Sequence, residues 1–247
     1  MKAPQFLIKS IRFYFGLFLI IGLMLLLFVD LTLYSQGQDI RETVEKQSNI
    51  EAAHELNLAF ESSLKIIQKQ AQAISDWDEV HQQFHDPSYY FFWHDERLTE
   101  SGYFKPYYDG LELYKSNKQL LMPASPNERI HFFLPEKLDN LEPSFLLSEN
   151  LEMHLNIYQK IKNRGSDEII GYIGISIDFL PFFLKNNTFY HVNKSSISFK
   201  GVGKIPYTDI MEHVNYQPVS NPVSDYLWQL IQDFIVELIV LMIIVSL

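Results

Sequence analysis

Two long apolar runs lie near the ends of this chain, and the region between them mixes polar and apolar residues. The first run, from Phe13 to Val29, contains no charged residue, and Lys2, Lys9 and Arg12 precede it. A run of this length predicts a membrane span, and the basic residues in front of it predict a cytoplasmic N-terminus. The run is longer than the apolar core of a cleavable signal peptide, and no small-residue cleavage pattern follows it. We therefore expect the span to be retained.

The second apolar run, FIVELIVLMIIVSL, occupies residues 234–247, and no cluster of Lys or Arg follows it. It predicts a second span, in a chain that is the front portion of a longer protein. The predicted order is a cytoplasmic N-terminus, a first transmembrane helix, an external domain and a second transmembrane helix, over residues 1–12, 13–33, 34–225 and 226–247.

A long amphipathic helix is predicted directly after the first span, over residues 38–84. This stretch is almost free of Gly and Pro, and its apolar residues recur at steps of three and four. Such a helix would be roughly 70 Å long and could join an external domain mechanically to the bilayer. Residues 35–37, Ser-Gln-Gly, are the place where it could be separated from the span.

Alternating apolar and polar residues further along predict two hairpins. The first has strands at 110–114 and 119–122, and the second has strands at 151–162 and 169–177. A loop-rich connector, 124–150, joins the hairpins, and 178–184 reads as a strand that gives way to a short helix. The expected fold is therefore α+β, an antiparallel sheet with helices on one face.

Composition narrows the possible functions. The chain has 20 basic and 30 acidic residues, which argues against nucleic acid as a partner. It contains no cysteine, so disulfides, thiolate metal sites and a catalytic cysteine are excluded. A domain of this size without disulfides outside the cytoplasm is typical of a bacterial envelope, so we expect the inner membrane, with the domain in the periplasm.

No enzyme signature is present in the sequence. Neither a phosphate-binding glycine loop nor a Gly-x-Ser-x-Gly elbow occurs in the required context. We expect the chain to be no enzyme and to need no cofactor.

Candidate ligand-binding residues gather near the end of the long helix and in the aromatic stretch after it. Trp77 and His81 are four residues apart and share a helical face beside Asp78, where an indole and a carboxylate could hold an amine or a small polar ligand. The alternative is that Trp77 anchors the core and Asp78 caps the following loop. For the tyrosines at 103, 107 and 108, lining a pocket and filling the core are equally open interpretations. The predicted ligand-binding set is Trp77, Asp78, His81, Tyr103, Tyr107 and Tyr108.

Metal binding is a second interpretation of the same helix end. Asp78, His81 and His85 fall at i, i+3 and i+7, which would bring them near one face if the helix reached His85. Pro87 follows closely, and no fourth ligand is in view, so we expect no bound metal.

Two short motifs carry a resemblance to a known family. The sequence ISDWDEVHQQF at 74–84, an aromatic-rich segment, and YDGLELYKSNKQL at 108–120 together resemble the fourth class of CHASE domains, over roughly residues 42–183. The pattern departs from the family in having one Trp in the first motif, and Arg97-Leu98 stands where an Asn-Leu element is usual. The resemblance implies a PAS-like sheet over 108–184 and a sensory role, often joined to GGDEF or EAL domains that make or degrade cyclic di-GMP.

The sequence thus predicts the extracytoplasmic input module of a dimeric bacterial receptor, which binds a small ligand of unknown identity. Its partners would be that ligand, a second copy of the chain and membrane lipid. The alternative is a membrane-anchored periplasmic module that binds a protein and senses no small ligand.

Overall fold

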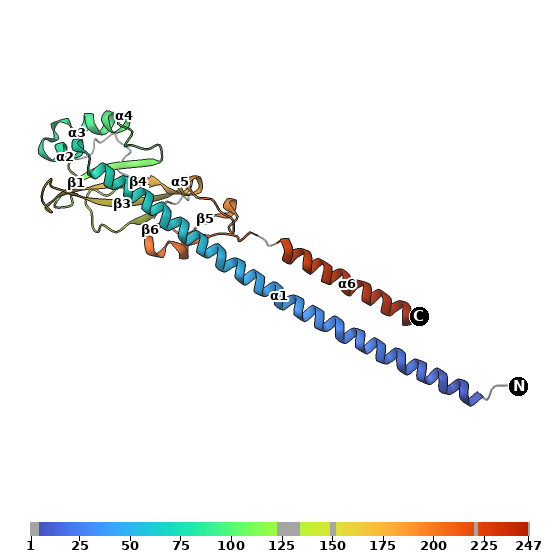
Figure 1. Cartoon of the computed structure of the whole chain (residues 1–247). Coiled ribbons are helices and arrows are strands. Elements are labelled where there is room, and N and C mark those ends of the chain that lie inside the picture. Colours follow the sequence, from blue (N-terminus) through green and yellow to red (C-terminus); the bar gives the residue numbers. More distant parts are fainter. Residues whose placement is uncertain (1–4, 123–133, 149–151, 220–221, 247) are drawn as a thin grey trace. The chain divides into compact units, whose positions relative to one another are not determined.

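The computed structural model describes residues 5–122, 134–148, 152–219 and 222–246 (Figure 1). Parts of the predicted connector 124–150 lie outside these residues. The chain divides into two compact units, which we call the helical unit and the sheet domain. The helical unit comprises Met1–Glu51 and Pro218–Leu247, and the sheet domain comprises Ala52–Gln217.

One helix, α1 (Gln5–Ser75), belongs to both units and is 71 residues long. The possible separation at 35–37 does not occur, because the helix continues through these residues without interruption. Gly37 serves packing instead: a Cβ at this position would lie 3.0 Å from Ile231 and 3.2 Å from the Trp228 ring. Glycine weakens a helix interior by about 1 kcal/mol relative to alanine, and here it allows a second helix to approach closely.

The long helix also ends earlier than predicted. It stops at Ser75, and a separate helix, α2 (Asp78–His85), follows. Trp77 between them is extended, with φ −72° and ψ 133°. Its ring packs on Tyr103, with the ring centroids 4.6 Å apart. If α1 continued through Trp77, this ring could not pack on Tyr103 in the same way. The aromatic contact therefore favours the break between α1 and α2.

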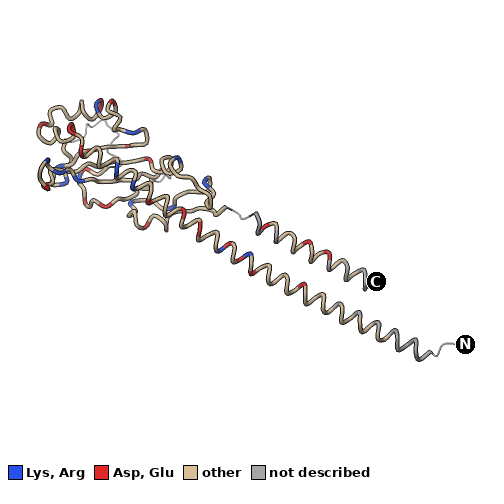
Figure 2. The backbone as a smooth tube through the Cα atoms, in the orientation of Figure 1, with Lys and Arg blue, Asp and Glu red and all other residues tan. Residues whose placement is uncertain are grey.

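The first part of α1 is apolar and exposed. Figure 2 shows few charged residues in the described part of α1 before Asp30 and many along the rest of the helix. Within the described residues, α1 is the one helix that is long and apolar enough to cross a membrane. The chain is thus compatible with membrane association through α1. The second apolar run forms the helix α6 (Pro222–Ser246), whose role as a span stays a prediction.

The sheet domain is α+β, as predicted, with an antiparallel sheet of five strands in the order β1-β4-β3-β2-β6. The predicted second hairpin is confirmed as β3–β4. The return strand of the predicted first hairpin is reduced to the bridge between Tyr114 and Leu120, and β2 lies in the predicted connector. The strands of the sheet are β1 (Tyr108–Lys115), β2 (Ser144–Leu147), β3 (Met153–Lys162), β4 (Ile169–Asp178) and β6 (Gly203–Pro206).

Shorter elements complete the domain. The predicted short helix after the second hairpin is present as α5 (Phe179–Asn186). Four helical segments follow one another between α2 and β1: η1 (Pro87–Tyr89), α3 (Tyr90–Phe92), η2 (Trp93–Arg97) and α4 (Leu98–Glu100). The remaining elements are η4 (Lys194–Ser196), η5 (Tyr207–His213) and a two-stranded sheet of β5 (Ser198–Phe199) with β7 (Val214–Asn215).

The core lies between α1 and one face of the large sheet, which we call the apolar face. Helix α1 contributes buried residues at steps of three and four from Ala52 onward, as an amphipathic helix does. Phe60 of this helix stacks on Phe183 of α5, with centroids 4.6 Å apart. The buried strand residues of the apolar face include Leu111, Leu113, Phe145, Leu155, Ile157, Ile173, Ile175 and Ile177.

Candidate functional site

The opposite face of the sheet carries buried polar side chains beside a cluster of three buried tyrosines, Tyr114, Tyr158 and Tyr172. Side chains alternate along a strand, so residues between those of the apolar face point the other way. The strand register aligns Gly110, Ser176, Asn156 and Ser144 in one row across four strands. We call this side the polar face, and its most buried polar members are Glu112, Ser144, His154, Asn156 and Ser176, each less than a tenth exposed.

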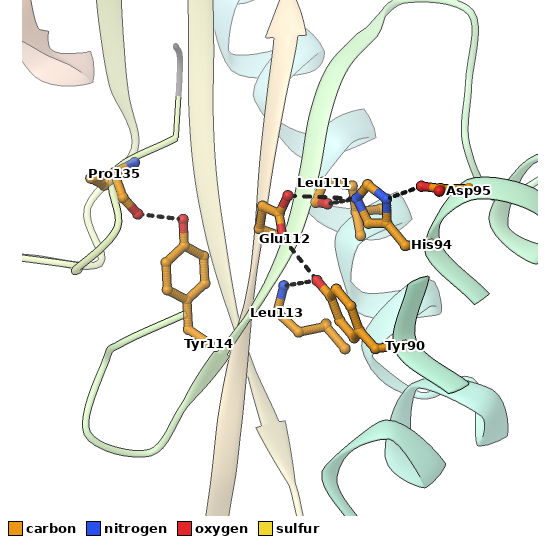
Figure 3. A network of polar contacts seen from close by, with 8 residues as sticks. All are labelled: Tyr90, His94, Asp95, Leu111, Glu112, Leu113, Tyr114 and Pro135. Carbon is orange, nitrogen blue, oxygen red and sulfur yellow. Dashed lines mark hydrogen bonds and ion pairs between the residues drawn. The ribbon is translucent and has the colours of Figure 1, made fainter. Parts of the chain in front are cut away.

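At one end of the polar face, a network centres on Glu112 (Figure 3). The Tyr90 hydroxyl donates to Glu112 Oε2 at 2.8 Å, and His94 Nε2 lies 3.5 Å from Glu112 Oε1. The same two side chains also meet the backbone of β1: His94 Nε2 lies 2.9 Å from the Leu111 carbonyl oxygen, and the Leu113 N–H donates to the Tyr90 hydroxyl at 3.5 Å. The network thus attaches the helical segments 87–97 to the end strand of the sheet.

His94 carries a positive charge in this network. Its Nδ1 lies 3.0 Å from Asp95 Oδ1, so both ring nitrogens face oxygen acceptors, and only a protonated imidazole can donate from both. Burial alone lowers the pKa of His94, but the hydrogen bond and charge of Glu112, with Asp95 and the Leu111 carbonyl, outweigh it and raise the pKa to about 9. Burial and the Glu112 charge also raise the pKa of Tyr90, which keeps its hydroxyl a donor.

A second group, which we call the acidic group, consists of Asp109, Glu152, His154 and Asp178. Asp109 Oδ2 lies 2.7 Å from His154 Nδ1, and because β4 separates β1 from β3, this contact reaches across β4. Asp178 stands directly opposite His154 in the register. Burial and the charges of Asp109 and Glu152 raise the pKa of Asp178, while His154 opposes them. The group therefore concentrates negative charge at the ends of three strands.

The residues predicted to bind a ligand do not converge on one place. Tyr107 and Tyr108 meet at Gln70 of α1: the Gln70 amide donates to the Tyr107 hydroxyl at 2.8 Å, and the Tyr108 hydroxyl donates to Gln70 Oε1 at 3.0 Å. Trp77 packs on Tyr103 against the core. These four rings fill the space on the α1 side of the sheet, so the core alternative describes them better than a pocket does.

The predicted charged members lie outside that cluster. The Asp78 carboxylate is mostly exposed and forms an ion pair with Arg164 in the turn between β3 and β4. His81 is half-buried and His85 is exposed, at the last residue of α2. Within the described residues, no group of three or more His, Asp or Glu side chains is placed to hold a metal ion.

Glu112, His94, His154 and Asp178 were not predicted from the sequence. The signal for Glu112 was present: in Gly-Leu-Glu-Leu-Tyr it alternates with two leucines, which normally marks a solvent-facing position. What the pattern could not show is that Tyr90 and His94, from segments 87–97, contact Glu112 and bury it. A charged residue covered in this way requires a partner.

Comparisons with protein-family models, with curated proteins and with solved structures found no match for this chain.

Proposed function

We propose that this chain is the extracytoplasmic input module of a bacterial transmembrane receptor, which binds a small ligand and passes a conformational change through the membrane. The observation that carries this proposal is the continuity of α1. The helix is apolar and exposed in its first part, and from Ala52 onward it forms one wall of the sheet domain's core. A change in how the sheet packs on α1 therefore acts on the same helix that enters the membrane.

The buried polar face supports a sensory role. Burying a polar side chain without a partner costs free energy, and a core built only for stability would hold apolar residues there. The strand order β1-β4-β3-β2 supports a PAS-like interpretation of the sheet, in which a ligand lies between the sheet and the segments that cover it. The polar face is the side that such a ligand would contact.

Two contacts offer routes for the signal. In the sheet domain, the Glu55 carboxylate of α1 accepts three backbone N–H groups, from Tyr190, His191 and Val192, at 2.7 to 3.0 Å. In the helical unit, the Trp228 ring of α6 lies 5.8 Å from the Tyr34 ring and 5.7 Å from the Arg41 guanidinium of α1. A ligand that binds one packing arrangement more tightly would shift the populations at these contacts.

The remaining features follow from the same proposal. The sheet domain lies in the periplasm, α6 is the second span, and two copies of the chain form the working receptor. The output is cytoplasmic, and turnover of cyclic di-GMP is the output that the CHASE resemblance implies.

The test uses the full chain in lipid nanodiscs, screened by thermal unfolding against small metabolites. We expect at least one compound to raise the unfolding midpoint in proportion to its concentration. Spin labels are then placed on cysteines introduced at Asp39 in α1 and Gln232 in α6, in a chain that has no other cysteine. The same compound should change the distance between the labels. A compound that stabilises the domain without changing this distance would contradict signal transmission.

The protein-binding alternative has one specific observation in its favour. Tyr89, Phe91 and Phe92, in the segments that follow α2, are 41% to 66% exposed. Exposed aromatic side chains next to one another are typical of protein interfaces. If no compound changes the midpoint, this surface becomes the better candidate.

A further inference from the structure

We propose that the acidic group of the polar face, Asp109, Glu152, His154 and Asp178, binds a small organic cation through an ammonium group. This inference rests on the proposed sensory function and names the class of ligand. The site is distinct from the Trp77–Asp78 region in which the sequence predicted ligand binding.

The charge balance of the group favours a cationic ligand. The group contains three carboxylates and one imidazole, so acidic side chains are in excess. The Asp109 side chain is a quarter exposed, while the His154 side chain in contact with it is almost fully buried. Carboxylates that solvent can reach, in contact with a buried side chain, attract a cation and can hold it by charge-assisted hydrogen bonds.

Asp178 is the carboxylate best placed to receive the ligand. It is the residue immediately before α5, where an Asp side chain normally accepts a hydrogen bond from the first turn of the helix. Its side chain makes no such capping bond. The Asp178 carboxylate is thus not engaged by the helix that it precedes. It interacts repulsively with the charges of Asp109 and Glu152, and a bound ammonium ion would relieve this repulsion.

Ser176 provides the second, independent observation. It lies on β4 two residues before Asp178, so both side chains point to the polar face. Its hydroxyl is fully buried and has no hydrogen-bond partner within the described residues. Buried hydroxyls are normally paired, because an unpaired one loses its hydration without compensation. A second polar group on the ligand would supply that partner.

The geometry favours an organic cation over a metal ion. The described His, Asp and Glu side chains include no set of three that converges at metal-ligand distances. An ammonium group tolerates a looser arrangement, since its three N–H donors reach acceptors at about 2.8 Å, whereas metal ligands must lie within about 2.0–2.6 Å of the ion.

The experiment measures the thermal unfolding of the full chain in nanodiscs with 1,4-diaminobutane, at constant ionic strength. The matched control compound is 1,4-butanediol, which has the same length without the charges. We expect the diamine to raise the midpoint with concentration and the diol to have no effect. The proposal is overturned if neither compound changes the midpoint, or if the two act alike.

Variants locate the binding. Asp178→Asn should weaken diamine binding by about tenfold or more, because a charged acceptor is lost. It should also raise the midpoint of the ligand-free protein, because repulsion with Asp109 and Glu152 is removed. Ser176→Ala should weaken binding less. The control is Asp167→Asn, which removes an exposed carboxylate paired with Lys162 in the β3–β4 turn and should change nothing. A diamine response that survives Asp178→Asn would place the site elsewhere and overturn the proposal.

The outcome separates this inference from the proposed function. If another class of compound stabilises the protein and moves the spin labels while amines do not, the sensory function stands and the cation site fails. If no compound acts, both fail.

Discussion

At the scale of the residue, the pair formed by His94 and Glu112 makes the stability of the sheet domain depend on pH. The pKa of His94 is about 9 in the folded protein and 6.5 in an exposed histidine. Since the folded pKa is the higher one, the stabilisation is complete below pH 6.5 and is lost as the pH rises through 9. We expect the free energy of unfolding to fall by as much as roughly 3 kcal/mol across this window.

The measurement is urea unfolding at pH values between 6.5 and 9. His94→Gln should be less stable near neutral pH and should lose this dependence. His85→Gln, which changes an exposed histidine, should keep the wild-type profile. A flat wild-type profile would show that His94 is neutral in the folded protein.

Gly171 in β4 is a second residue with a sharp prediction. A Cβ at this position would overlap the Phe84 ring and the backbone oxygen of Tyr114. Gly171→Ala should therefore destabilise the domain by about 1–3 kcal/mol, as overpacking does. Gly165→Asn is the control: Gly165 has φ 79° in an open turn, which Asn tolerates. Denaturation midpoints compare the two, and equal losses would contradict the predicted overlap.

At the scale of the element, the contact between α1 and α6 depends on the absence of a side chain at Gly37. Gly37→Leu should push Trp228 away from α1 and lengthen the distance between spin labels at Asp39 and Gln232 by a few ångströms, since helices spaced 8–10 Å apart are separated by their contact side chains. Ser35→Leu, on an exposed position of the same helix, should leave the distance unchanged. An unchanged distance in both variants would mean that Gly37 does not set the spacing.

Glu55 ties α1 to the loop at 190–192. Glu55→Gln removes the charge and one of the two acceptor oxygens, so we expect a loss of about 1–3 kcal/mol and faster amide exchange at Tyr190, His191 and Val192. Hydrogen exchange measured by mass spectrometry checks this. Glu61→Gln, on an exposed position six residues further along α1, is the control. Unaltered exchange in the Glu55 variant would remove this contact from the signalling route.

The elements with a strong periodic pattern could be predicted from the sequence, and those decided by packing could not. The hairpin β3–β4 and the helix α5 follow from alternation and from turn residues around Gly165. The break at Trp77 depends on Tyr103, which is 26 positions away, and no local pattern encodes it. The same holds for the candidate site: the polar face exists because distant segments cover Glu112 and because the register aligns Ser176 with Asn156.

At the scale of the whole molecule, the proposed topology can be tested by single cysteines, since the chain has none of its own. In intact cells, a maleimide that does not cross membranes should label Ser116→Cys, in the turn after β1. It should not label Lys2→Cys or Ser246→Cys, which the proposed two spans place in the cytoplasm. Opening the cells should make both reactive. Labelling of Ser246→Cys in intact cells would contradict a second span in α6.

The network around Glu112 has one more consequence, for self-association. Strand β1 is at the end of the sheet, where unpaired backbone groups are a template for a strand from another chain. Tyr90 and His94 occupy two of these groups, at Leu113 N–H and the Leu111 carbonyl. Removing them would free these two groups for pairing with another chain, so Tyr90 and His94 also protect the protein from associating through this part of β1.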